Sequence, residues 1–586
     1  MFQQDLNPVG GSLALSALCA AIPLVTLFVL LGGLRLKAWV AGLISLAVAL
    51  VVAVALFKMP VGQALLAGTE GAAFGFFPIL WIVINAIWVY NLTVASGHFD
   101  VLRRSFEKVS PDQRIQAIII AFCFGALLEA LAGFGTPVAI SVVMLMALGF
   151  QPLKAATVAL IANTAPVAFG ALATPIVTLA SVTSGVNDDP RLNIDTLGGM
   201  VGRQTPILAV LVPLVLVFVV DGKRGVRQMW LPSIVCGLAF GLAQFVAANY
   251  ISVPLADIVA ALVAAGAVVG LLRVWKPAHE LTAAEVDRET EAADGADGGS
   301  GSAPSKRRQP SGISTSVTSS TGRGGTATAR DTATSDSSAD VVRAYAPYAV
   351  IIAIFSITNI PAVKEFLAEK PFTFAFAWPG LEVLNTAGEP VSTTMFNFNW
   401  LPAAGTLMIF AGLITMVILK LSPAKAFKTY LETYVELKSA IITVMAVLAL
   451  AYVMNLSGQT GSLGAWLAGA GAAFAIISPI LGWIGVAVTG SDTSANALFG
   501  ALQVQTAVEA GLDPVLMASA NTSGGVLGKM VSPQNLAIAA AAVGLAGREG
   551  DIFRKVIGWS LGLLVLMCVI VGLQATPVLS WMVPGS

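Results

Sequence analysis

The sequence is poor in charged residues and in the side chains that most often bind metals. Charged residues make up 11% of its 586 residues, whereas a soluble globular protein has roughly 25%. It has two histidines, so a histidine-based metal site is not expected. Each of the four cysteines stands alone in an apolar segment, which indicates buried small side chains rather than ligands or disulfides. These cysteines are Cys19, Cys123, Cys236 and Cys568.

The sequence also gives little sign of an enzyme or of nucleic-acid binding. There is no H-E-x-x-H sequence, and two histidines are too few for a general-base dyad. The formal net charge is zero and no basic stripe is present, so no nucleic-acid partner is expected. We therefore predict that the protein is not an enzyme and that it has no metal and no cofactor.

What the chain does have is hydrophobic sequence, which amounts to 56% of its residues. Apolar runs near the length of about 20 residues that spans a bilayer recur along it. This pattern predicts an all-α polytopic membrane protein with about 12 transmembrane helices, and it makes the lipid bilayer a partner. The runs lie at 12–33, 36–57, 72–90, 206–220, 231–248, 254–274, 342–360, 401–420, 438–456 and 556–575.

A hydrophilic segment divides the chain into two membrane halves. Residues 277–340 are rich in Gly, Ser, Thr and charge, and we interpret them as a disordered linker. The predicted halves are residues 1–276 and 341–586. The N-terminus has no basic residue before its first apolar run, so we expect a retained first helix rather than a cleaved signal peptide.

Lys and Arg are concentrated in a few short loops, which predicts that these loops are cytoplasmic. On that basis the linker is cytoplasmic, and both termini and the loop 361–400 lie outside. The basic residues that decide this are Arg35, Lys37, Arg103, Arg104, Lys108, Arg114, Lys223, Arg224, Arg227, Lys306, Arg307, Arg308, Lys425, Lys428, Arg548, Arg554 and Lys555.

Two regions of the chain repeat one another. "ANTAPVAFGALATP" at 162–175 matches "ANTSGGVLGKMVSP" at 520–533, and "GFGTP" at 133–137 matches "GSDTS" at 490–494. We place repeat 1 at 72–180 and repeat 2 at 438–545, with opposite orientations in the membrane. Inverted repeats with re-entrant hairpins and interrupted helices are typical of secondary transporters. We expect both Asn-Thr motifs to break their helices.

Polar residues within these motifs are the candidate substrate-binding residues. A broken helix at membrane depth is tolerated where it lines a wet cavity, and a helix N-terminus favours an anion. Gly524 and Gly525 have an equal alternative role as packing glycines. The candidates are Thr136, Asn163, Thr164, Ser491, Thr493, Ser494, Asn521 and Thr522.

Three ionisable residues in apolar surroundings are candidates for ion coupling, because such residues are costly in a membrane. They are Glu129, Asp492 and Lys529. Glu129 is the first choice as proton carrier. If Lys529 pairs with Glu129, however, Asp492 becomes the better candidate. A purely structural ion pair is the alternative for Lys529, and a position near a helix end is the alternative for Glu70, Arg203 and Asp221.

Four long motifs carry a family resemblance. "EALAGFGTPVAI" at 129–140, "ANTAPVAFGA" at 162–171, "GSDTSANALFGALQ" at 490–503 and "ANTSGGVLGKMVSPQNLAIA" at 520–539 closely resemble the bacterial L-lactate permease family, which includes glycolate permeases. The resemblance spans nearly the whole chain outside the linker. It implies an elevator-type carboxylate transporter and a proton symporter of small 2-hydroxy monocarboxylates in the plasma membrane.

We therefore expect proton-coupled symport of L-lactate, D-lactate and glycolate, with a carboxylate and protons as partners. Sodium coupling is the alternative, because the polar motifs are rich in neutral oxygens. A membrane-embedded enzyme and a channel are candidates from different functional classes. The two histidines are too few for a general-base dyad, and a channel would need a continuous pore rather than two facing interrupted helices. The oligomeric state is left open, with a homodimer as one candidate.

Overall fold

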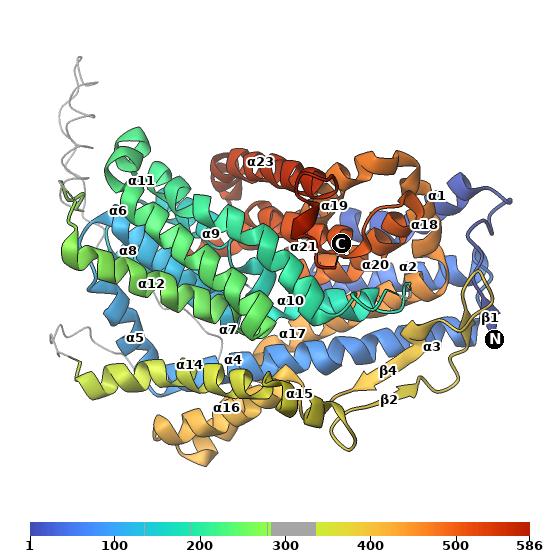
Figure 1. Cartoon of the computed structure of the whole chain (residues 1–586), viewed down its shortest axis with the longest axis horizontal. Coiled ribbons are helices and arrows are strands. Elements are labelled where there is room, and N and C mark those ends of the chain that lie inside the picture. Colours follow the sequence, from blue (N-terminus) through green and yellow to red (C-terminus); the bar gives the residue numbers. More distant parts are fainter. Residues whose placement is uncertain (134, 188, 278, 283–335, 586) are drawn as a thin grey trace.

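The computed structural model describes residues 1–133, 135–187, 189–277, 279–282 and 336–585. Long helices run alongside one another across the molecule (Figure 1). The first are α1 (Leu13–Phe28), α2 (Ala38–Ala55), α3 (Val61–Phe74), α4 (Trp81–Ala95) and α5 (His98–Glu107). A proline-containing kink, η2 (Gly75–Leu80), joins α3 to α4.

The first repeat region contains a helical hairpin followed by a broken helix. The hairpin runs through α6 (Gln113–Gln116), η3 (Ala117–Phe124) and α7 (Gly125–Ala132), turns, and returns as α8 (Thr136–Ala147). The broken helix consists of α9 (Pro152–Ala162), η4 (Val167–Phe169) and α10 (Gly170–Thr183), and it bends by 61°. The "ANTAP" motif therefore lies at a helix break, as predicted.

Helix α11 (Ile194–Val246) is a folded-back pair rather than one rod. Its 53 residues would make about 80 Å of straight helix, far more than the bilayer core of about 30 Å. The backbone leaves the helical conformation at Asp221 and Gly222. Beyond this turn the two arms touch, since a Cβ at Gly237 would lie 2.5 Å from the Val210 carbonyl oxygen. Helix α12 (Ala256–Val274) completes the first half.

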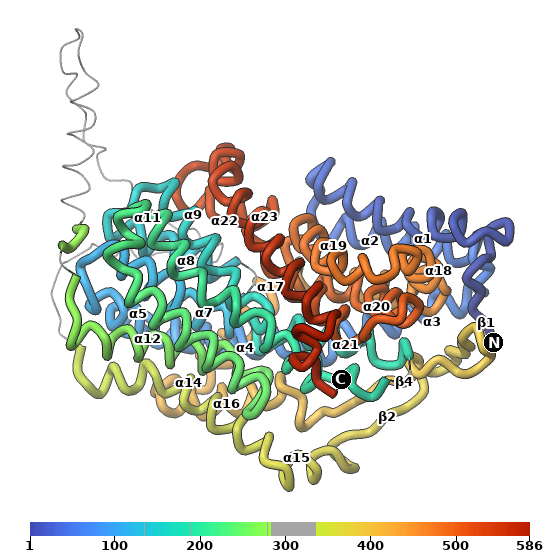
Figure 2. Tube along the Cα trace, turned by 45° about the horizontal axis from the view of Figure 1, so that its top comes forward, coloured from blue at the N-terminus to red at the C-terminus, as the bar shows by residue number. Residues whose placement is uncertain are grey.

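The second half begins with α14 (Ser338–Thr358) and α15 (Pro361–Ala368), followed by short strands. These are β2 (Phe374–Ala377), β3 (Val383–Leu384) and β4 (Met395–Phe398), and β2 pairs antiparallel with β4. The remaining elements are α16 (Ala404–Ile418), α17 (Pro423–Leu456), α18 (Gln459–Leu467), α19 (Phe474–Thr489), α20 (Asp492–Ala510), α21 (Pro514–Gly528), α22 (Pro533–Ala542) and α23 (Glu549–Gln574). Figure 2 shows α18 to α20 grouped with α1 and α2 at one end, and α5, α7, α8, α9, α11 and α12 grouped at the other.

Among the described residues, ten helices are long and apolar enough to cross a membrane, or eleven if α9 and α10 count as one bent span. The prediction was about 12, and the difference comes from two places. The apolar run 401–420 forms only α16, whose 15 residues reach about 22 Å and fall short of a crossing. The runs 206–220 and 231–248 both lie in α11, which counts as one helix.

The segment "ANTSGGVLGKMVSP" breaks its helix, as predicted, but the break does not lie beside the Asn-Thr pair. Residues Pro514–Gly528 form one continuous helix, and the break comes later, between Lys529 and Ser532. The glycines serve close packing instead, because a Cβ at Gly524 would collide with the Pro479 carbonyl oxygen of α19. The packing alternative thus holds for Gly524.

Several contacts place the termini on one side of the helical bundle. Strand β1 (Phe2–Gln3) pairs with β3, so the N-terminus lies beside the loop 361–400. Arg191 donates to Asp513 at 2.9 Å and to the Pro584 carbonyl oxygen at 3.1 Å. A Cβ at Gly185 would collide with Ser392, which joins this second group to the first.

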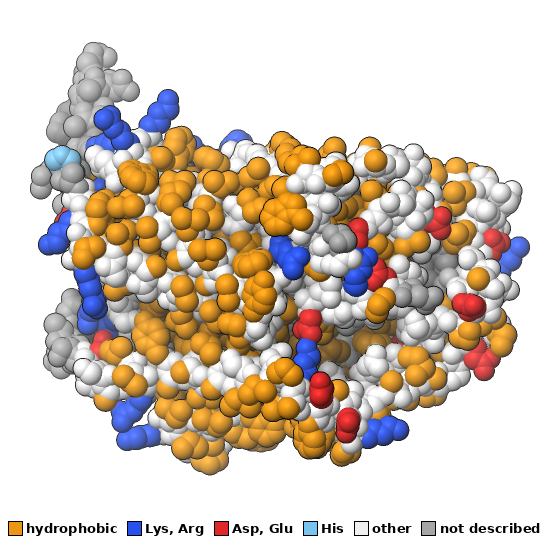
Figure 3. Space-filling view, viewed as in Figure 1, with side chains coloured by type: hydrophobic (Ala, Val, Ile, Leu, Met, Phe, Trp, Pro, Cys, Tyr) orange, Lys and Arg blue, Asp and Glu red, His pale blue; other side chains and the backbone are white. Residues whose placement is uncertain are grey.

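The described ends of the predicted linker are held at the other side. Arg114, which is 1% exposed, donates to Asp112 and to the His279 carbonyl oxygen at 2.6 Å. Arg104 bonds Asp336 at 2.6 Å, and this hydrogen bond lowers the pKa of Asp336. Residues 283–335, most of the predicted linker, lie outside the described residues. In Figure 3 Lys and Arg side chains gather at this end of the molecule.

Cys123, Cys236 and Cys568 are buried free cysteines, as predicted, and the Sγ atoms of Cys123 and Cys236 lie 3.6 Å apart between η3 and α11. One expectation about a buried residue needs correction. Glu70 is not interfacial, because it is fully buried between α3 and α17. The position of Glu70 near a predicted helix end in the sequence therefore did not indicate how deeply its side chain is buried.

Candidate functional site

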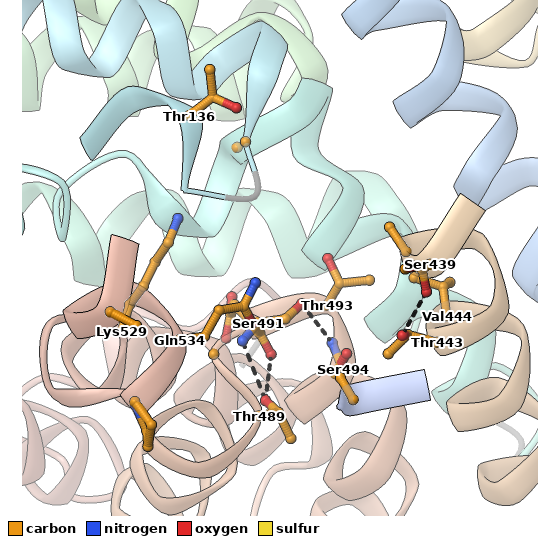
Figure 4. Close-up of a pocket in the computed structure, with 18 of the residues that line it drawn as sticks. Thr136, Ser439, Thr443, Val444, Thr489, Ser491, Thr493, Ser494, Lys529 and Gln534 are labelled. Atoms are coloured by element: carbon orange, nitrogen blue, oxygen red, sulfur yellow. Dashed lines mark hydrogen bonds between the residues drawn. The ribbon is translucent and has the colours of Figure 1, made fainter. Parts of the chain in front are cut away.

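A cavity of about 1160 Å³ lies where the two repeat regions meet. The first tip (Gly133, Gly135 and Thr136) joins α7 to α8, and the second tip (Thr489, Gly490 and Ser491) joins α19 to α20. Gly133, Thr136 and the second tip line the cavity. In Figure 4 Thr136 lies on one wall, and Ser491, Thr493 and Ser494 lie on the opposite wall.

Local sequence places a helix N-terminus at each tip. Gly135 and Gly490 have φ of 88° and 76°, a left-handed conformation that glycine adopts without steric cost. Ser491 then caps α20 by accepting a hydrogen bond from the Ser494 N–H. A third N-terminus, that of α22, is formed by Ser532 and Pro533. Helix N-termini carry partial positive charge, so this arrangement suits an anion.

A buried ion pair joins the two halves at the cavity. Lys529 Nζ, from the break after α21, lies 2.6 Å from Glu129 Oε1 on α7. Asn163 donates to the other carboxylate oxygen of Glu129 at 3.0 Å. Gly170 makes room for this carboxylate, since a Cβ there would lie 2.8 Å from Oε1. Both charged residues line the cavity, so the pair faces any molecule that enters.

Asp492 also lines the cavity, but unlike Glu129 it has neither an ion pair nor a hydrogen bond to its carboxylate among the described residues. It is 3% exposed, and neither carboxylate oxygen has a hydrogen-bond partner among the described residues. A Cβ at Gly525 would collide with its Oδ1, so this glycine leaves the space that the carboxylate occupies. An ionised carboxylate without hydrogen bonds is costly in a buried site.

The predicted site residues fall into two groups. Seven line the cavity, and these are Glu129, Thr136, Ser491, Asp492, Thr493, Ser494 and Lys529. The Asn-Thr pairs do not line it. Asn521 and Thr522 both donate to Asn496 Oδ1, at 2.8 and 3.0 Å, and Thr164 bonds the Ile161 carbonyl oxygen at 2.7 Å. In the structure, the pairs belong to a buried polar layer behind the cavity.

Sequence reasoning missed other residues of the cavity wall. Gln534 follows the Ser532–Pro533 start of α22, within the motif at 520–539. The signal for it was this Ser-Pro helix start, three residues after Lys529. Arg35, Lys37, Glu436 and Glu549 also line the cavity. Behind the site, Gln244 joins the Ala165 carbonyl oxygen at the helix break to Asp257, which is fully buried.

No metal centre is formed by the part of the chain that the structure describes, since it has no group of three or more His, Cys, Asp or Glu residues that could hold an ion. The cavity therefore offers hydroxyl groups, helix N-termini, the Lys529 ammonium group and the carboxyl groups of Glu129 and Asp492, besides the charged side chains of Arg35, Lys37, Glu436 and Glu549.

Comparisons with known proteins agree with the motifs. A family model described as L-lactate permease matches residues 16–578. The chain belongs to the L-lactate permease family. It is 40% identical to the L-lactate permease of Bacillus subtilis strain 168, with 99% of each chain covered. It is also 38% identical to the L-lactate permease of Escherichia coli K12, over the full length of both chains.

A third relative, the glycolate permease GlcA of Escherichia coli K12, is 41% identical with 98% of each chain covered. The members of the family are permeases, not enzymes. With ten or eleven apolar helices among its described residues, this chain is a multi-pass bacterial membrane transporter of that family.

Proposed function

We propose that this protein is a proton-coupled symporter of L-lactate and related 2-hydroxy monocarboxylates, D-lactate and glycolate, in the bacterial plasma membrane. The observation that carries the proposal is the Glu129–Lys529 ion pair, which joins the two halves at a cavity lined by both tips. The names of the relatives support lactate and glycolate as the substrate class.

The substrate carboxylate would bind between Lys529 and the two tips. The ammonium group and the N-terminal N–H groups of α8 and α20 supply positive potential. Thr136, Thr493 and Ser494 add hydroxyl donors from the cavity wall. Val167, Ala171 and Val531 line the same cavity and suit the methyl group of lactate.

Proton binding is assigned to Asp492, with Glu129 as the alternative carrier. Glu129 is compensated by Lys529 at 2.6 Å, so those two charges cancel. A lactate anion would add one negative charge beside Asp492, whose carboxylate lacks hydrogen-bond partners among the described residues. A proton on Asp492 removes the repulsion between the two carboxylates. Anion and proton then promote each other's binding, as linkage requires.

The transport cycle is proposed to follow from the two repeats. Each supplies one hairpin tip and one helix break, which supports inverted repeats and an elevator-type motion. The cavity reaches Arg35 and Lys37, which lie in loops that the positive-inside rule assigns to the cytoplasm. On this assignment the cavity faces the cytoplasm, the predicted linker is cytoplasmic and both termini are outside. A homodimer remains one candidate for the assembly.

Sodium coupling is the second candidate, and the observation that favours it is again Asp492. A buried carboxylate that accepts no hydrogen bond from the described residues suits a small cation as well as a proton. The two ions are distinguished by uptake of labelled lactate into reconstituted liposomes under imposed pH and sodium gradients. Uptake that follows only the sodium gradient would reject the proton proposal.

The same liposomes test the proton assignment through Asp492→Asn and Glu129→Gln. We expect Asp492→Asn to lose accumulation driven by a pH gradient while retaining lactate exchange at equal concentrations, because its side chain is permanently neutral. Glu129→Gln should still accumulate lactate. The opposite pattern, with accumulation lost only in Glu129→Gln, would move the proton to Glu129.

A further inference from the structure

Gln534 presents an uncommitted amide to the cavity. It is the second residue of α22, which starts at Pro533, and it lines the cavity together with Lys529 and both tips. Its side chain makes no hydrogen bond to any residue that the structure describes. Figure 4 shows it between Lys529 and Ser491.

The position of Gln534 is fixed by its neighbour Asn535. Asn535 is 1% exposed, and its amide donates to Ser532 Oγ at 2.8 Å and to the Gly490 carbonyl oxygen at 3.3 Å. Gly490 also lies close to Gln534, since a Cβ there would be 2.7 Å from Gln534 Oε1. The first tip closes on the other side, where a Cβ at Gly135 would collide with Ile538. Helix α22 thus packs between the two tips.

The free amide of Gln534 supplies a neutral donor and acceptor, which neither the ammonium group nor the helix N-termini supply. Lys529 and the helix N-termini attract a carboxylate but do not distinguish a 2-hydroxy acid from the corresponding simple acid. A neutral amide has a donor and an acceptor on separate atoms. A hydroxyl group is likewise both donor and acceptor, so the two groups can form a reciprocal pair of hydrogen bonds.

We infer that Gln534 is the residue that recognises the 2-hydroxyl group of the substrate. The hydroxyl would donate to Oε1 and accept from Nε2, while the carboxylate lies toward Lys529. This inference rests on the proposed function. It makes Gln534 a specificity-determining residue and assigns no part of the proton step to it.

The test is competition against exchange of labelled lactate in liposomes, with unlabelled lactate and propionate as competitors. Propionate is lactate without its 2-hydroxyl group. Net hydrogen bonds between neutral groups correspond to roughly 3- to 10-fold in affinity. We expect Gln534→Leu and Gln534→Met to reduce the preference for lactate over propionate by about that factor, with the inhibition constant of propionate nearly unchanged.

Gln151→Leu is the matched control, because Gln151 is an exposed glutamine at the start of α9, outside the cavity. Its lactate preference should equal that of the wild type. If both apolar variants fail to fold, Gln534→Asn, which keeps a shortened amide, should give an intermediate preference.

An unchanged lactate-to-propionate ratio in every folded Gln534 variant would overturn the inference and leave the proposed function intact. Equal inhibition of the wild type by the two acids would also overturn it. Absence of any lactate exchange by the wild type would instead overturn the proposed function, so the two failures are distinguishable.

Discussion

At the scale of single residues, the Glu129–Lys529 pair does two jobs. The two charges of the pair cancel in the protein interior, and under the proposed function the Lys529 ammonium group also attracts the substrate anion. Removing one member of a buried pair typically costs about 3–5 kcal/mol, because the other charge stays behind. The same change removes a binding group, so stability and binding must be measured separately.

Lys529→Met should therefore lower the thermal unfolding temperature of the purified protein and abolish lactate exchange. The double variant Lys529→Met with Glu129→Gln should regain most of the stability, since no unpaired charge remains. It should not regain lactate exchange. Thermal unfolding followed by tryptophan fluorescence and exchange assays provide the two readouts. Wild-type exchange by the single variant would show that Lys529 is only structural.

Sequence alone identified the seven site residues that line the cavity, because charged and hydroxyl residues beside a Gly turn stand out in apolar surroundings. It could not determine where the Asn-Thr pairs point. A polar side chain in a membrane helix needs a partner, and that partner can be a substrate or another side chain. Asn521 and Thr522 are satisfied by Asn496, 25 residues away from Asn521 along the chain.

At the scale of elements, the turn at the start of α10 has an unusual backbone. Ala171, Leu172 and Ala173 are all left-handed, with φ of 45°, 56° and 59°. Such a conformation costs an L-residue other than glycine about 1–2 kcal/mol. Ala171 lines the cavity, so this strained turn shapes the wall beside Glu129.

Ala173→Gly should leave the unfolding temperature unchanged or raise it, because relief of strain offsets the greater freedom that glycine gives the unfolded chain. Ala173 is fully buried but does not line the cavity. In the matched control, Ala159→Gly within the regular helix α9 should cost about 1 kcal/mol. If Ala173→Gly lost as much stability as the control, the conclusion that this turn is strained would be wrong.

The helix break in the second repeat shows why the course of an element was harder to predict than its existence. The break was expected beside the Asn-Thr pair, yet Asn521, Thr522 and the two glycines after them lie inside α21. Glycine permits a break but also permits close helix packing, and only the position of α19 decides between them. The break occurs between Lys529 and Ser532. The Ser-Pro step at 532–533 is a better signal for the end of a helix than the glycines are.

At the scale of the whole molecule, the two halves are connected through a long hydrophilic segment whose described ends are held by Arg114 and Arg104. Replacing residues 283–335 by a flexible Gly/Ser segment of about 20 residues should leave lactate exchange unchanged, since both anchors remain. Changing Arg114 to Ala should instead lower stability, because it leaves Asp112 without its buried partner. Loss of exchange on replacing the segment would show that it takes part in transport.

The ion pair across the halves also has a consequence for how such a carrier could be encoded. If the chain were cut between residues 283 and 335, each polypeptide would carry one buried charge whose counter-charge belongs to the other. Either fragment made alone would expose its bare charge to the membrane and be a substrate for quality-control proteases. Made together, each would protect the other, so two genes would have to be kept in balanced expression. A single covalent chain removes that requirement, since it delivers Glu129 and Lys529 in equal number.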